Sequence, residues 1–327
     1  MASVAPEAVD VLRPAGVGVE EGAVAGKSPR QLFWARFKKD KAALASSAVI
    51  VLLILVAVFA GVISKHLVGH GPNQLFSSQA LDEFGLPKGL TSEFWFGADS
   101  AGRDAFVRVL YGARTSLLVA LLATGFAVVI GVVVGIVAGY FRGFTDTVIS
   151  RSLDTILAMP LLLFAIGIVA ACGTTKEGCL GGLIEPGLGL VIFVIAIFSW
   201  PYIARIIRGN VLSIREKEFV EASRSLGAGH LRIMFREVLP NLVAPITVYA
   251  TLLIPSNILF EAALSFLGLG VPQSTPSWGQ MLADASSIFD VAWWLMLFPG
   301  LFLVATTLAF NLLGDGLRDA LDPRTGR

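Results

Sequence analysis

Six long stretches of this chain contain no charged side chain. A helix needs about 20 mainly apolar residues to cross the hydrocarbon core of a membrane. The whole chain is 55% apolar and only 15% charged, whereas soluble domains carry about 25% charged residues. We therefore predict an all-α membrane protein with six transmembrane helices, at Ala42–Ser64, Thr115–Phe141, Thr155–Thr175, Pro186–Ala204, Val238–Phe260 and Val291–Gly314.

A seventh charge-free run, Ala262–Ala283, is not counted as a span. It contains GLGVPQSTPSWGQ, whose glycines, prolines and polar side chains disfavour a continuous helix. Backbone groups that face lipid must be hydrogen-bonded within their own segment. A run of this composition is therefore predicted to be a loop or a re-entrant turn.

The basic residues predict the orientation of the chain. With the N-terminus inside, the inner segments hold 19 Lys and Arg residues and the outer segments hold six. Lys and Arg accumulate in the cytoplasmic loops of membrane proteins. Both termini are therefore predicted to be cytoplasmic, as is the loop between the fourth and fifth spans, residues 205–241.

The N-terminal segment divides into two parts. Residues 1–29 are predicted to be a disordered cytoplasmic tail, because they are rich in Ala, Val, Gly and Glu. Residues 30–41 are predicted to be a basic amphipathic lead-in on the inner membrane surface. The first apolar run is too long for the core of a signal peptide. Residues 42–314 then form the transmembrane domain, and residues 315–327 a second cytoplasmic tail.

The sequence predicts no catalytic, cofactor or metal site in this chain. The segment EGAVAGKS at 21–28 ends like a phosphate-binding loop, but Glu21 stands where that motif has glycine. His66, His70 and His230 are scattered, and two cysteines are too few for a zinc site. A net charge of +1 gives no indication of nucleic-acid binding. We predict that the chain itself is not an enzyme and that any ATP and Mg²⁺ are bound by other subunits.

Residues 218–241, EFVEASRSLGAGHLRIMFREVLPN, are charged and amphipathic although they lie between two apolar spans. Helical periodicity predicts a first helix over residues 215–226 and a second that starts near Leu231, each with an apolar face. The predicted form is a helix-turn-helix finger that projects from the membrane. The alternative is a linker that lies on the lipid headgroups.

Glycine and proline mark the ends of the helices in this finger. Gly227 and Gly229 can end the first helix, because glycine accepts the left-handed conformation found after helix C-termini. Pro240 is predicted to begin the fifth span, since proline is tolerated in the first turn of a helix.

Small and helix-breaking residues stand out within the spans. Gly131, Gly135 and Gly139 recur every four residues in the second span. Such a stripe lets another helix approach closely, and that helix belongs either to this chain or to a partner subunit. Pro160 and Pro255 each remove a helical hydrogen bond, which predicts a kink in the third and the fifth span.

Four residues near span ends are assigned to the membrane boundary. Glu261 is expected to lie just beyond the hydrocarbon and to cap local backbone, although a carboxyl group at membrane depth would be a functional candidate. Trp278, Trp293 and Trp294 are expected to form part of an aromatic belt at the interface.

The longest outer segment, residues 65–114, carries many charges and offers a polar surface for a docking partner. Asp104 and Arg108 lie four residues apart, so we expect them to pair on one helix face.

Cys172 and Cys179 flank a six-residue loop on the predicted outer side, where disulfides form. A loop of this length can bring two Cα atoms within the roughly 4.4–6.8 Å that a disulfide needs. A disulfide is predicted there, with two independent thiols as the alternative.

The finger, with its EASRSLG and following LPN, resembles the EAA loop of bacterial ABC-importer permeases. The rest of the chain is similar to one branch of that superfamily, the C-type permease subunits of dipeptide and oligopeptide importers. The similarity rests on FGADSAGRDAFVRVLYGARTSL at 96–117, LDTILAMPLLL at 153–163, EAALSFLGLGVPQSTPSWGQML at 261–282 and NLLGDGLRDALDPR at 311–324.

This resemblance implies a type I ABC-importer permease fold in a bacterial inner membrane. The finger would be a coupling helix that seats in a groove on an ATPase, with the coupling residues Glu221, Ala222, Ser223, Gly227, Leu239 and Pro240. The implied partners are a homologous second permease, two ATPase subunits, membrane lipid and an extracytoplasmic binding protein. The implied solute is a peptide, and the same branch also moves nickel, glutathione and opines.

Two other classes of membrane protein are disfavoured by the sequence. A secondary transporter usually carries ion-coupling carboxylates near the middle of the membrane, and the predicted spans contain none there. An intramembrane enzyme needs a nucleophile and a base within its spans, whereas all three histidines lie outside them.

Overall fold

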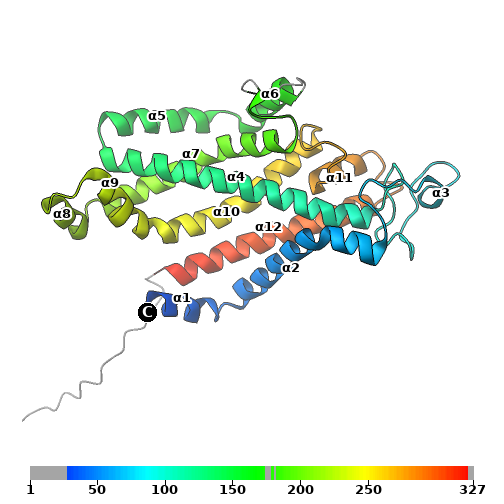
Figure 1. The fold of residues 1–327 in the computed structure, drawn as a ribbon, viewed down its shortest axis with the longest axis horizontal. Helices are drawn as coiled ribbons and strands as arrows, with labels where there is room; N and C mark the ends of the chain where they lie inside the picture. Colours follow the sequence, from blue (N-terminus) through cyan, green and yellow to red (C-terminus); the bar gives the residue numbers. More distant parts are fainter. Residues whose placement is uncertain (1–27, 174–177, 180–181, 323–327) are drawn as a thin grey trace, which may run out of the picture.

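The computed structural model describes residues 28–173, 178–179 and 182–322, so the predicted tails at 1–27 and 323–327 lie outside the described residues. Within the described ranges the protein is built from helices and forms no β-strand (Figure 1). The helices are α1 (Pro29–Phe37), α2 (Lys41–Ile63), η1 (Ser64–Val68), α3 (Ser77–Ala80), α4 (Ala105–Phe141), α5 (Phe144–Ala158), α6 (Leu161–Gly173), α7 (Leu188–Ile214), α8 (Glu218–Ser225), α9 (His230–Arg232), η3 (Ile233–Val238), α10 (Leu239–Phe266), α11 (Trp278–Ala285) and α12 (Trp294–Leu321).

Within the described residues five helices are long and apolar enough to cross a membrane, and the number reaches the predicted six if one bent pair of helices counts as a single span. Four of these helices contain one each of α2, α4, α7 and α12. The fifth runs from His230 to Phe266 and includes α9, η3 and α10. The bent pair is α5 and α6, which meet at 84° around Pro160. Met159 has extended backbone, as expected for a residue before proline. The third span is therefore broken between two helices, a sharper change than the predicted kink.

Several helices extend beyond the charge-free runs that predicted them. α4 begins at Ala105, where Asp104 caps it by accepting hydrogen bonds from the backbone N–H groups of Phe106 and Val107. α12 continues to Leu321, so residues 315–321 of the predicted C-terminal tail are helical. Charged residues mark where hydrocarbon ends, and a helix can continue past that boundary into water.

The glycine stripe of α4 packs against α7 of the same chain. A Cβ atom on Gly131 would lie 2.7 Å from the Cβ of Ile203, and one on Gly139 would lie 2.7 Å from that of Val211. At Gly135 a Cβ would approach the carbonyl oxygen of Ala204 to 2.7 Å. Side chains at these three positions would separate the helices. The stripe therefore serves the chain's own bundle, one of the two alternatives left by the sequence.

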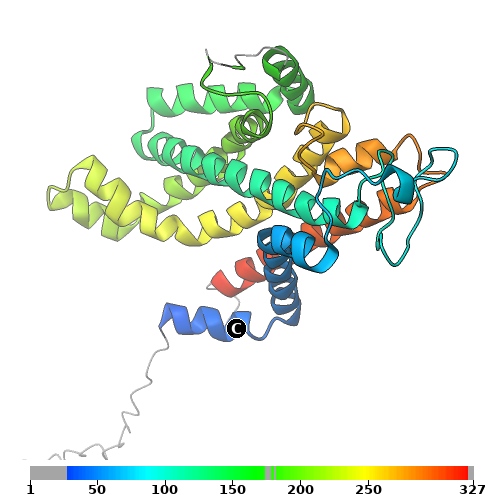
Figure 2. The same ribbon diagram turned by 45° about the vertical axis from the view of Figure 1, so that its right-hand side comes forward.

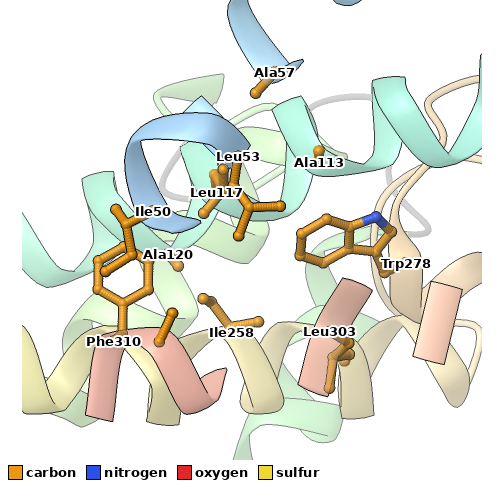
Figure 3. Close-up of a cluster of buried hydrophobic side chains, with 12 residues drawn as sticks. Ile50, Leu53, Ala57, Ala113, Leu117, Ala120, Ile258, Trp278, Leu303 and Phe310 are labelled. Carbon is orange, nitrogen blue, oxygen red and sulfur yellow. The ribbon is translucent and has the colours of Figure 1, made fainter. Parts of the chain in front are cut away.

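The core lies where α2, α4, α10, α11 and α12 meet, around Trp278 (Figure 3). Trp278 is fully buried, and its indole N–H donates to the Val109 carbonyl oxygen. Trp294 is also buried and donates to the Ala98 carbonyl oxygen, whereas Trp293 is 53% exposed. The predicted interfacial belt is therefore wrong for Trp278 and Trp294, whose indoles have protein partners in place of headgroups.

The bundle has two distinct ends (Figures 1 and 2). α8, α9, α1 and the end of α12 lie at one end, where Arg36 Nη1 donates to the Asp322 carbonyl oxygen at 2.6 Å. α3, α11 and the long segment between η1 and α4 lie at the other end. The finger, α1 and the described end of α12 therefore lie at the same end of the bundle.

Candidate coupling site

The finger consists of α8, a tight turn at Gly227, and α9 continued by η3. Gly227 has a φ of +81°, the left-handed conformation that glycine accepts most readily. Its N–H donates to the Arg224 carbonyl oxygen, and the N–H of Ala228 donates to that of Ser223. These two hydrogen bonds form a Schellman motif, which satisfies carbonyl groups at the end of α8. The predicted helix-turn-helix is confirmed, with the turn at Gly227; Gly229 has an ordinary φ of −68°.

One side of the finger is packed against the bundle. Val220, Ile233, Met234 and Val238 are buried in a cluster with residues of α4, α7 and α10. Val220 faces inward, toward this cluster. The finger is therefore fixed to the bundle by its own hydrophobic contacts, which a floppy loop would lack.

The other side of the finger presents apolar side chains to the surroundings. We call the set formed by Phe219, Leu226, Leu231 and Phe235 the finger surface. Their exposed fractions are 41%, 88%, 69% and 58% respectively. Exposed apolar groups gathered in one place are typical of a surface that contacts another molecule.

Four of the six predicted coupling residues lie on the finger itself. Glu221, Ala222 and Gly227 are exposed, and Ser223 is partly buried. Leu239 and Pro240 lie apart from them, in the first turn of α10, as predicted for Pro240. Among the described residues no ion pair involves Glu221.

Polar contacts fix the finger to the end of α4. Arg215 Nη1 donates to the Tyr140 carbonyl oxygen at 2.5 Å, and the Tyr140 hydroxyl is hydrogen-bonded to His230 Nδ1 at 2.9 Å. Arg142 and Glu216 form an ion pair at 2.5 Å beside them. Burial, followed by the charge of Arg142, lowers the pKa of Arg215 from its usual value, but arginine stays protonated at neutral pH.

Sequence analysis missed this connection between the finger and α4. The partners lie 74 to 90 residues apart in the chain, and no local periodicity relates them. These contacts connect the finger region to α4, which is in turn packed closely against α7 through the glycine stripe.

At the opposite end of the bundle, the charged outer segment folds back on itself. Asp104 contacts His70 Nδ1 at 2.6 Å, in addition to capping α4. Arg108 pairs with Asp99 at 3.3 Å and donates to the Asn73 side chain at 3.2 Å. The expected Asp104–Arg108 side-chain pair is therefore wrong, because each side chain has a partner from the preceding loop.

Glu261 lies inside the bundle and not at its edge. The side chain is fully buried and accepts hydrogen bonds from Ser116 at 3.0 Å and Ser265 at 2.6 Å. Ser277, beyond the loop that follows α10, is 3.4 Å from the Ser265 hydroxyl, and Ser116 also accepts from the N–H of Trp278. The expectation of a backbone cap is wrong: hydroxyl groups of α4 and α10 satisfy this carboxyl group.

Cys172 and Cys179 are joined as a disulfide in the structure, with Cα atoms 5.0 Å apart. They connect the end of α6 to a short bridge that pairs Cys179 with Ile184. This geometry is compatible with the predicted disulfide, whose formation in the membrane stays a prediction.

The chain matches two protein families. Residues 28–80 match the N-terminal transmembrane domain of oligopeptide transport permease C. Residues 131–327 match the binding-protein-dependent transport system inner membrane component. This chain is a C-type permease subunit of the binding-protein-dependent ABC importers. The family assignment confirms the resemblance based on the finger and the four stretches of sequence.

Curated relatives and solved structures agree with this assignment. The glutathione transport system permease protein GsiD of Shigella sonnei is 41% identical over 298 residues, which cover 91% of each chain. GsiD of Shigella flexneri serotype 5b is 42% identical over the same share. A chain from the structure entitled inward facing conformations of the MetNI methionine ABC transporter matches with a TM-score of 0.55 at 19% identity, over 66% of this permease and 96% of that chain. At that identity the structural match shows the fold alone.

Permease subunits of this family are not enzymes themselves. They are membrane-spanning components of ABC importers, in agreement with the helices described above.

Proposed function

We propose that this permease forms half of a pathway that carries small peptides into a bacterial cell, using ATP hydrolysed by two separate ATPase subunits. A homologous permease would form the other half, and an extracytoplasmic binding protein would deliver the solute. The observation that carries the peptide assignment is the 41% identity over 91% of the chain with a glutathione transport permease, since glutathione is itself a small peptide. Nickel and opines remain the alternatives that the sequence left open.

The finger is proposed to be the contact with one ATPase subunit. Its apolar surface of Phe219, Leu226, Leu231 and Phe235 is exposed at the end of the bundle that carries α1 and the end of α12. Glu221 is exposed beside that surface and can reach a basic residue of the ATPase groove. A rigid element with two arrangements can transmit such a contact as rigid-body motion.

Uptake by the assembled complex in proteoliposomes tests the peptide assignment. Radiolabelled glutathione and trialanine are supplied outside, with the binding protein, and ATP is supplied to the ATPases. We expect ATP-dependent uptake of at least one of them, with no uptake when the binding protein is left out. Uptake of nickel or an opine but of neither peptide would contradict the proposal.

The orientation is proposed to place both termini and the finger in the cytoplasm. Single cysteines at Ser223 and Ser274, in a chain whose own two cysteines are replaced by serine, should react with an impermeant thiol reagent from opposite sides of the membrane. Ser223 lies on the finger and Ser274 on the exposed loop before α11. Labelling of both from the same side would contradict the six-span arrangement.

A further inference from the structure

A polar face runs along α7 toward the end that carries the finger. It consists of Ser199, Tyr202, Arg205 and Arg208, which follow one another at intervals of three residues, so that the row winds around the helix as it approaches the finger. This face is turned toward α5 and α10, because Arg205 and Arg208 pair with residues of α5, and the Ser199 hydroxyl donates to Asn257 of α10 at 2.8 Å.

The two arginines of this face differ in how firmly they are held. Arg208 binds Asp146 with two hydrogen bonds, of 2.5 and 2.8 Å, and the side chains are only 29% and 18% exposed. Arg205 makes a single ion pair with Asp154, and these side chains are 52% and 55% exposed. Exposed single pairs contribute little to stability, so their members can exchange partners at small cost.

Two hollows border this face. One, of about 390 Å³, is lined by α5 and α7 and includes both ion pairs and Arg151. The other has a volume of about 380 Å³ and lies one turn of α7 closer to the N-terminus of that helix. It is lined by Tyr202, Ser199 and Asn257 together with apolar residues of α5, α6 and α10. Each volume lies in the range of pockets that hold small ligands.

Lipid is an unfavourable environment for the exposed Arg205–Asp154 ion pair. Arg205 lies within the helix Leu188–Ile214, and Asp154 lies in the bent pair that completes the sixth span. Ionisable side chains within membrane-spanning segments face water-filled cavities or protein, because hydrocarbon does not solvate their charge. Arg205 and Asp154 each bound a charge-free run, so the pair lies at the edge of the hydrocarbon, where charged side chains face water or protein.

We propose that Arg205 and Asp154 bind the charged ends of the peptide as it crosses, Arg205 taking the carboxylate and Asp154 the ammonium group. This inference rests on the proposed function. A guanidinium group can bind a carboxylate through two parallel hydrogen bonds. Asp154 forms one hydrogen bond with Arg205, so it occupies only part of the donor capacity of the guanidinium group. The hollow holds three arginines, Arg151, Arg205 and Arg208, and two aspartates, Asp146 and Asp154, which leaves one positive charge in excess.

The test compares trialanine with trialanine amide, which lacks the C-terminal carboxylate. Uptake is measured in proteoliposomes of the complete complex, at binding-protein concentrations that saturate each probe. The wild-type complex should prefer the free acid. Arg205→Gln should lower uptake of the free acid roughly tenfold and change uptake of the amide less than about twofold, because only the free acid loses its partner.

The same logic applies to the ammonium end. Asp154→Asn should lower uptake of trialanine roughly tenfold and leave N-acetyltrialanine, which lacks the ammonium group, within about twofold of wild type. If Arg205→Gln prevents assembly, Arg205→Lys keeps the charge and loses the fork, and should reduce the preference for the free acid by an intermediate amount.

Arg208→Gln is the matched control in the same hollow. It breaks the better-buried pair with Asp146 and should lower uptake of the free acid and the amide in equal proportion. If Arg205→Gln also lowered uptake of the free acid and the amide in equal proportion, the inference would be overturned. That result would indicate that Arg205 stabilises the structure or contacts the second permease. A wild-type complex that hydrolyses ATP but takes up neither glutathione nor trialanine would overturn the proposed function itself, and the inference with it.

Discussion

Gly227→Val is expected to reduce solute-stimulated ATP hydrolysis by the assembled importer at least about tenfold, while the chain still inserts into the membrane. Gly227 has a φ of +81°, and a β-branched side chain in this region of backbone space costs about 1–3 kcal/mol. The Schellman hydrogen bonds at the end of α8 would then be lost or displaced. The finger surface would be misplaced on its proposed ATPase, so that closure of the ATPases would no longer move the permease.

Gly229→Ala is the control in the same turn. Gly229 has an ordinary φ of −68°, and a methyl group added to it would meet nothing within 4 Å. Stimulated hydrolysis should therefore stay within about twofold of wild type, since no strain or clash is introduced. Glu221→Lys reverses an exposed charge without touching the backbone and should also reduce stimulation. Full stimulation in both Gly227→Val and Glu221→Lys would refute the coupling role.

The long helices could be predicted because their cause is local. Charge-free runs of sufficient length located the five long apolar helices and the bent pair α5 and α6, and Pro160 indicated the bend within that pair. Helix ends were less predictable, because a helix can extend beyond the hydrocarbon. The first ten residues of α4 carry Arg108 and still form helix, capped by Asp104. A rule based on charge alone begins this segment ten residues too late, at Thr115 instead of Ala105.

The partners of buried polar residues were not predictable, because they depend on the tertiary fold. Trp278 has the amphipathic character of an interfacial residue, yet its indole N–H finds Val109 in the core. Glu261 is satisfied by Ser116, 145 residues away. For Trp278 and for Glu261, the residue type predicted a position at the membrane surface. Each side chain is buried instead, because a distant segment of the chain supplies its hydrogen-bond partner.

The candidate site was predictable in part. The helical periodicity and the glycines of the finger predicted its form, but not which apolar side chains face outward. Both sides of the finger carry apolar residues, so the pattern alone cannot tell the face that packs on the bundle from the exposed finger surface. The Arg205–Asp154 pair was missed because Arg205 bounds a charge-free run, and the sequence treats it as the end of a span.

Gly135→Ala is expected to destabilise the permease by about 1–3 kcal/mol, the usual cost of overpacking a close contact. The added methyl carbon would lie 2.7 Å from the Ala204 carbonyl oxygen and 2.9 Å from the Cβ of Ile207. Both are fixed to the backbone of α7, so neither can yield by a change of rotamer. The helices must separate, and the contact that links the finger through α4 to α7 is weakened.

Thermal unfolding of the purified complex measures this effect, with Gly125→Ala as the matched control. Gly125 lies on the same helix, but a methyl group there would meet nothing within 4 Å. Alanine is a better helix former than glycine by up to about 1 kcal/mol, so Gly125→Ala should leave the midpoint unchanged or raise it. Gly135→Ala gains the same helix propensity and should nevertheless lower the midpoint, because the clash with α7 outweighs the gain. Equal midpoints for the two variants would show that α4 and α7 are not in close contact at Gly135.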